Sequence, residues 1–75
     1  MILIYKMEGC PYCNKVLKHL EEKNIEYKAL DISENANHDA LMHWGGKEQV
    51  PFLVDTDKNI HMYESSDIIE YIDTL

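Results

Sequence analysis

A run of five apolar residues, Met1-Ile2-Leu3-Ile4-Tyr5, opens the chain and constrains its fold more than any other feature. The run is rich in β-formers and shows no polar alternation, which is typical of a strand buried on both faces of a sheet. Such a sheet has to be covered on both sides, and 75 residues leave room for one core. The run therefore favours a single α/β domain, residues 1–75, with helices on both sheet faces.

Apolar periodicity places the next two elements. From Cys13 to Leu20, apolar residues fall at i, i+3, i+4 and i+7, which is the stripe of an amphipathic helix. Pro11 suits the first turn of that helix, and Asn24 can end it. Residues 25–30 then alternate between apolar and polar, as a half-buried strand does.

The second half of the chain predicts a helix, a hairpin and a last helix. The second helix is expected from about residue 35 to the glycines at 45 and 46. Residues 52–54 and 60–63 flank a polar loop and read as an antiparallel hairpin. Ser65 or Ser66 can cap the last helix. The predicted order is βαβαββα, and its first two strands are parallel.

Charge and hydropathy exclude several classes of partner. The chain carries seven lysines, no arginine and fourteen carboxylates, with a formal net charge of −7. Sites for nucleic acid concentrate Lys and Arg, so no nucleic-acid partner is expected. No apolar run approaches the length of a membrane span, and the first residues lack the basic leader of a signal peptide. We expect a cytoplasmic protein with no membrane partner.

The two cysteines are three positions apart, in the sequence Cys10-Pro11-Tyr12-Cys13. A disulfide between them closes a very small ring and would be a poor structural staple, so redox or metal chemistry is favoured. Because Cys10 stands at the start of a helix, backbone N–H groups and the helix dipole lower the pKa of its thiol. Cys10 is therefore the expected nucleophile, and Cys13, one turn further along, is the expected resolving thiol.

The two cysteines have two other interpretations. Both could be small buried apolar residues, as free cysteines often are. They could also form a Cys2His2 zinc site with His38 and His43, which have H-x4-H spacing. The gap between Cys13 and His38 is about twice the ~12 residues usual in zinc fingers, which disfavours this metal site.

Three motifs together resemble the glutaredoxins of the dithiol type. They are Cys10-Pro11-Tyr12-Cys13 after the first strand, Val50-Pro51 before the third strand, and Glu64-Ser65-Ser66-Asp67 at the last helix. The resemblance implies a thioredoxin fold, with a four-stranded mixed sheet of order 2-1-3-4 flanked by three helices. It also implies a cis peptide bond before Pro51 that places Val50 beside the reactive cysteine.

The same resemblance implies an enzyme, a glutathione-dependent thiol-disulfide oxidoreductase. It would reduce glutathione mixed disulfides and protein disulfides as a monomer, with glutathione as cosubstrate and with no tightly bound cofactor or metal. In that family the Val50 backbone would pair with the cysteinyl part of glutathione, and the start of the last helix would hold its γ-glutamyl group. The implied glutathione contacts are Lys6, Tyr12, Gln49, Val50, Pro51, Glu64, Ser65, Ser66 and Asp67.

The chain departs from the usual pattern of the family at several points. Lys6 lies four residues before Cys10, where many members have a lysine three before it. Gln49 replaces a usual threonine, and Tyr63-Glu64 lies where a pair of glycines is frequent. Where other members offer Arg or Gln for the glycine carboxylate of glutathione, this chain has Lys47, Glu48 and Gln49. These departures leave open a redoxin reduced by thioredoxin reductase. A module that binds a [2Fe–2S] cluster through Cys10 of two subunits and glutathione is a further alternative.

Overall fold

The computed structural model describes all residues from 1 to 75. Four strands form one sheet of order β2-β1-β3-β4, in which β1 is parallel to β2 and antiparallel to β3. In chain order the elements are β1 (Ile2–Lys6), α1 (Pro11–Glu22), β2 (Tyr27–Asp31), α2 (Asn35–Gly45), β3 (Phe52–Asp55), β4 (Ile60–Met62) and α3 (Ser65–Ile72). The predicted βαβαββα order, the strand order 2-1-3-4 and the thioredoxin fold are confirmed.

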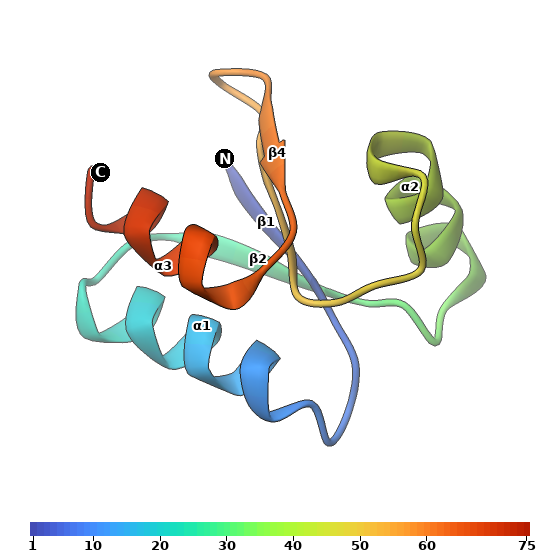
Figure 1. The fold of residues 1–75 in the computed structure, drawn as a ribbon, viewed down its shortest axis with the longest axis horizontal. Coiled ribbons are helices and arrows are strands. Elements are labelled where there is room, and N and C mark those ends of the chain that lie inside the picture. The colour runs from blue at the N-terminus through green and yellow to red at the C-terminus, as the bar shows by residue number, and fades with distance from the viewer.

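The helices lie on both faces of the sheet, as the apolar first strand predicted. Helices α1 and α3 pack side by side on one face, and α2 covers the other face alone (Figure 1). The first turns of α1, the α2–β3 loop and the start of α3 come together at one end of the sheet (Figure 1). No helix combines the length and the apolar character that a membrane crossing needs.

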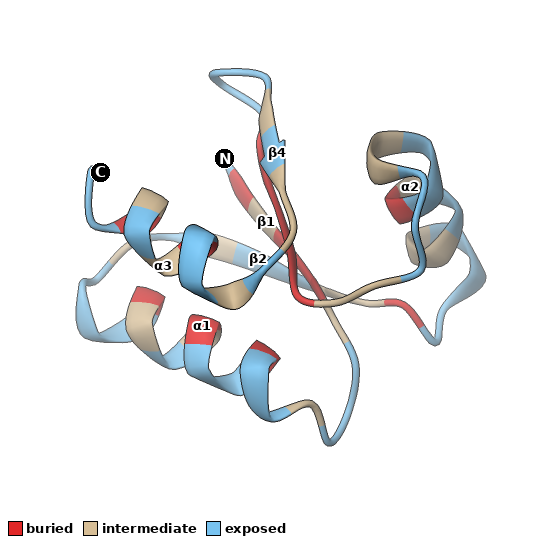
Figure 2. Cartoon of the chain, viewed as in Figure 1, coloured by how far each residue is buried: buried red, intermediate tan, exposed pale blue.

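The protein has a hydrophobic core on each face of the sheet. Strand β1 contributes side chains to both cores, because successive side chains of a strand point to opposite faces. Ile2 and Ile4 pack with residues of α1 and α3, while Tyr5 packs on the α2 face. Strand β3 alternates in the same way, and the buried positions follow these two strands and the inner faces of the helices (Figure 2). The first core contains Ile2, Ile4, Val16, Leu20, Leu53, Ile68 and Ile72, and the second contains Tyr5, Ile32, Leu41, Phe52 and Val54.

Two element boundaries differ from the sequence prediction. Strand β2 begins at Tyr27 rather than at residue 25, because the Ile25 amide still donates to the Leu20 carbonyl at 3.0 Å as the chain leaves α1. Strand β4 ends at Met62, one residue early, and the side chain of Tyr63 reaches the α2–β3 loop instead. The end of α1 is as predicted, since Asn24 follows the cap with a left-handed φ of 56°.

The predicted serine cap of the last helix is wrong. The N-cap of α3 is Glu64, whose φ is +69°, and no side chain caps the helix. Ser65 is already the first helical residue. The Glu64 carboxylate instead accepts a hydrogen bond from Gln49 Nε2 at 3.1 Å, which draws this residue toward the α2–β3 loop.

Candidate active site

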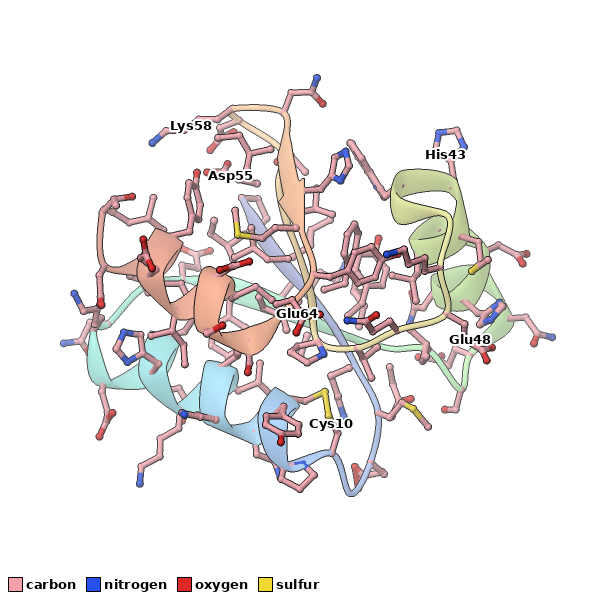
Figure 3. The ribbon with its side chains drawn as sticks, viewed as in Figure 1. Cys10, His43, Glu48, Asp55, Lys58 and Glu64 are labelled. Atoms are coloured by element: carbon pink, nitrogen blue, oxygen red, sulfur yellow. A yellow bond between two sulfur atoms is a disulfide. The ribbon has the colours of Figure 1, made fainter.

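Cys10 and Cys13 form a disulfide at the start of α1 (Figure 3), with their Cα atoms 5.2 Å apart. Cys10 is the N-cap residue with extended backbone angles, and Pro11 begins the helix, as the sequence predicted. The Cys13 backbone amide donates a hydrogen bond to Cys10 Sγ at 3.1 Å. The first turn of α1 thus directs a donor at the sulfur of Cys10.

The two sulfurs differ in access to solvent. Cys13 is buried, with 0% of its surface exposed, because it lies on the apolar stripe of α1 that contacts the sheet. Cys10 is only half-buried. After reduction, negative charge on Cys10 would be favoured by the amide of Cys13 and by the positive end of the helix dipole. An external disulfide can reach Cys10 and cannot reach Cys13.

A groove of about 510 Å³ adjoins the start of α1, and we call it the α3-side groove. Three segments form it: the first turns of α1, the end of the α2–β3 loop and the start of α3. The peptide bond before Pro51 is cis, as the resemblance implied. The lining residues are Tyr12, Lys15, Gln49, Val50, Pro51, Glu64, Ser65 and Ser66.

The α3-side groove brings together most of the residues that the sequence proposed as glutathione contacts, but two of them lie elsewhere. Lys6 is at the end of β1, where its Nζ lies 3.5 Å from Asp31 and 3.8 Å from Glu8. The side chain of Asp67 lines a separate pocket near the C-terminal part of α3. These two residues therefore do not line the groove.

Lys15 lines the α3-side groove and was not among the predicted residues. No carboxylate pairs with its ammonium group. The sequence did contain a signal, because Lys15 follows Tyr12 by three positions and residues at i and i+3 share a helix face. Lys15 adds a positive charge to a groove whose other charged side chain is Glu64.

Hydrogen bonds tie the α2–β3 loop to the segment that leads from β4 into α3. The Tyr63 hydroxyl donates to the Lys47 carbonyl at 2.8 Å and accepts from the Lys47 amide at 3.1 Å. The Lys47 ammonium also lies 5.5 Å from the centre of the Tyr63 ring, within reach of a cation–π contact. Together with the Gln49–Glu64 hydrogen bond, these contacts hold the α2–β3 loop, which carries Val50, against the start of α3.

A buried carboxylate anchors α3 at the opposite end of the sheet. Asp55 is 3% exposed and accepts a hydrogen bond from the Tyr71 hydroxyl at 2.6 Å. This hydrogen bond, reinforced by backbone amides of the hairpin, lowers the pKa of Asp55 although burial opposes the shift. Burial and the bond to Asp55 raise the pKa of Tyr71 to about 12. The pair holds the last helix against the β3–β4 hairpin.

No group of three or more His, Cys, Asp or Glu side chains is placed to hold a metal ion. His38 is engaged with Glu48, at 2.6 Å between Nε2 and Oε1, and both cysteines are in the disulfide. The side chains of the Cys2His2 alternative therefore do not come together.

Comparison with known proteins agrees with the fold and with the family resemblance found in the sequence. Glutaredoxin 1 of Rickettsia felis is 35% identical over 65 residues, which cover 81% of this chain and 61% of that protein. Glutaredoxin 2 of Escherichia coli is 35% identical over 72 residues, which cover 96% of this chain and 33% of that protein. The sequence profile of the glutathione S-transferase N-terminal domain matches residues 4–75. The chain belongs to the family of glutathione S-transferase N-terminal domains. It is a glutaredoxin with the thioredoxin fold.

A solved relative of this glutaredoxin contains the expected ligand. Glutaredoxin 2 from Salmonella typhimurium, in complex with glutathione, is 27% identical with a TM-score of 0.80, and the match covers 97% of this chain and 33% of that one. The present chain thus spans a third to three-fifths of the length of these relatives.

Proposed function

We propose that this glutaredoxin is a cytoplasmic, glutathione-dependent thiol-disulfide oxidoreductase that reduces glutathione mixed disulfides and protein disulfides. One observation carries the proposal: an accessible Cys10 caps α1 and forms a disulfide with a buried Cys13, beside a groove that can hold a small peptide. The glutathione-bound Salmonella typhimurium relative supports glutathione as the ligand of that groove. A dithiol pair that cycles in this way suits a reducing compartment.

The reaction begins when the Cys10 thiolate attacks the glutathione sulfur of a mixed disulfide. A bond forms between Cys10 and glutathione, the bond to the substrate sulfur breaks, and the released thiolate takes a proton. A second glutathione then attacks the glutathione bound to Cys10, which yields glutathione disulfide and restores the Cys10 thiolate. The sum is one mixed disulfide and one glutathione converted to one thiol and one glutathione disulfide.

Cys13 provides a second route after the first step. Its sulfur can displace the molecule bound to Cys10 and form the disulfide that the structure contains. Because Cys13 is sealed from solvent, it acts only on a partner already attached to Cys10. Two glutathione molecules then reduce the Cys10–Cys13 disulfide and leave as glutathione disulfide.

The α3-side groove offers suitable partners for each part of glutathione. The backbone of Val50, beside the cis bond to Pro51, can pair with the cysteinyl unit as an added strand would. The free amides at the start of α3, around Ser65 and Ser66, suit the γ-glutamyl carboxylate, and Glu64 suits its ammonium group. Lys15 offers a cation for a carboxylate. Lys6 and the Asp67 side chain have no part in this proposal, because neither lines the groove.

The assignment is tested by the turnover of a glutathionylated peptide by the wild-type protein and by the variants Cys10→Ser and Cys13→Ser. Glutathione supplies the electrons, and glutathione reductase with NADPH reports the glutathione disulfide that forms. We expect no turnover by Cys10→Ser and retained turnover by Cys13→Ser, because glutathione can replace the resolving thiol. Activity of Cys10→Ser would refute the assignment, and reduction by thioredoxin reductase in place of glutathione would favour the redoxin alternative.

A further inference from the structure

A second groove, of about 340 Å³, lies on the α2 side of Val50, and we call it the α2-side groove. It is formed by the β1–α1 loop, the residues that follow β2, the first half of α2 and the α2–β3 loop. Figure 3 shows Glu48 beside α2, Glu64 at the start of α3 and Cys10 at the start of α1. The lining residues are Met7, Glu8, Asp31, Ile32, Ser33, His38, Glu48 and Val50.

The reactive loop adjoins both grooves. Met7 and Glu8, which precede Cys10, line the α2-side groove, and Tyr12, which follows it, lines the α3-side groove. Val50 lines both of them. A disulfide substrate has two halves joined at the bond that Cys10 attacks. The two grooves therefore offer one place for each half.

The α2-side groove combines an apolar lining with negative charge. Met7 is 48% exposed, and it lines the groove with Ile32 and Val50. Three carboxylates, those of Glu8, Asp31 and Glu48, also line it, together with Ser33 and His38, and no lysine does.

One nearby lysine offsets only part of the charge of these three carboxylates, so the groove stays net negative. Lys6 lies between Asp31 and Glu8 and is held by them rather than free to bind a substrate carboxylate. His38 contacts Glu48 and lines the same groove. A hydrogen bond from the Ser33 amide is the main cause that lowers the pKa of Asp31, with Lys6 assisting, so this carboxylate stays ionised.

The α3-side groove differs in charge. Its charged side chains are one lysine, Lys15, and one carboxylate, Glu64, which already accepts a hydrogen bond from Gln49. It also includes the positive end of α3. A substrate that carries carboxylates is thus better placed there than beside Glu8 and Glu48.

We propose, on the basis of the function proposed above, that the α2-side groove binds the polypeptide half of a mixed disulfide and selects polypeptides with a Lys or Arg beside the half-cystine. The side chains of Lys and Arg combine an apolar stem with a cationic head. The stem matches the lining from Met7, Ile32 and Val50, and the head matches the carboxylates of Glu8 and Glu48. A Glu beside the half-cystine would instead face like charges.

Two glutathionylated peptides that differ only at the residue beside the half-cystine, Lys in one and Glu in the other, test the proposal. A third peptide with Ser at that position is the neutral reference. Exposed charge pairs have modest effects, so we expect kcat/KM for the Lys peptide to exceed that for the Glu peptide roughly tenfold at low ionic strength. Added salt should reduce this ratio.

A matched pair of double variants separates the groove from the overall charge of the protein. Glu8→Lys with Glu48→Lys reverses the charge of the groove, and Glu22→Lys with Glu26→Lys makes the same change in net charge at exposed sites outside both grooves. The single variant Glu8→Lys guards against misfolding, because the Glu8 side chain is 91% exposed.

The proposal predicts that the groove variants abolish or reverse the preference for the Lys peptide and that the control variants keep it. Equal rates for the Lys and Glu peptides at low ionic strength would overturn it. The same loss of preference in both double variants would also overturn it, since the cause would then be net charge. Failure to reduce even the Ser peptide would instead refute the proposed function itself.

Discussion

Replacing Tyr63 with phenylalanine removes the hydroxyl group that joins the segment between β4 and α3 to the α2–β3 loop. That hydroxyl makes both hydrogen bonds to the Lys47 backbone, at 2.8 and 3.1 Å. The ring contacts remain, including the packing on Phe52 with centroids 4.4 Å apart. The substitution therefore loosens the α2–β3 loop, which carries Val50, and leaves the core and Cys10 in place.

The size of the effect follows from these two hydrogen bonds. Each contributes about 0.5–1.5 kcal/mol when made in a protein, and the low end applies because water can reach Lys47. A loss of about 1 kcal/mol in the ordering of the loop corresponds to roughly a fivefold weaker affinity for a ligand that needs the ordered loop. We expect KM for glutathione to rise about fivefold with kcat nearly unchanged, since the reacting sulfur is not disturbed.

Steady-state kinetics with varied glutathione measures this effect, and Tyr27→Phe is the matched control. The Tyr27 hydroxyl also donates one short hydrogen bond, to Glu21 at 2.7 Å, but this residue lines neither groove. KM should be unchanged in that control. An unchanged KM in Tyr63→Phe, or an equal rise in both variants, would refute the idea that the Tyr63 hydroxyl positions the groove.

Two further substitutions test the contacts that hold α2 and α3. In Gly45→Ala the added Cβ would lie 2.6 Å from Cζ of Tyr63, so we expect a higher KM for glutathione and a lower melting temperature, and no change in either would contradict the close contact. Tyr71→Phe removes the main cause that holds the pKa of Asp55 low. A carboxyl group whose pKa is lower in the folded than in the unfolded protein stabilises the fold at pH values above its unfolded pKa. That stabilisation is lost as the pH falls through the folded pKa. Urea unfolding should therefore show a loss of about 1–3 kcal/mol at pH 7 and a smaller one at pH 2.5, and equal losses would contradict this linkage.

Features set by neighbouring residues could be predicted from the sequence. The alternation of β1 between two cores is a property of five consecutive residues. The start of α1 depends on Cys10 and Pro11, which are adjacent. The overall order of elements follows from such local patterns, and the structure confirms it.

Features set by distant residues could not be predicted. Local propensity favoured Ser65 or Ser66 as the cap of α3, but the observed cap, Glu64, bonds to Gln49, 15 residues earlier. Only the fold brings those two side chains together.

The placement of Lys6 has the same kind of cause. Lys6 stands opposite Asp31 in the register of β1 and β2, and the pair forms across the strands. The family pattern of a lysine before the first cysteine suggested that Lys6 contacts the ligand, and the strand register that pairs it with Asp31 was not known from the sequence. Lys15 was missed because the groove that it lines is built from three separate segments.

The central claim is that Cys10 is the activated and accessible thiolate. It is tested most directly by the rate at which each cysteine of the reduced protein is alkylated as a function of pH, measured by mass spectrometry. Cys10 should react first, with a titration midpoint clearly below the ~8.5 of a free cysteine, because Cys10 is the N-cap residue of α1 and its sulfur accepts a hydrogen bond from the first turn. Cys13 should stay unmodified until the protein unfolds, because none of its surface is exposed. A midpoint at or above ~8.5 for Cys10, or equal reaction of the two cysteines in the folded protein, would contradict the account.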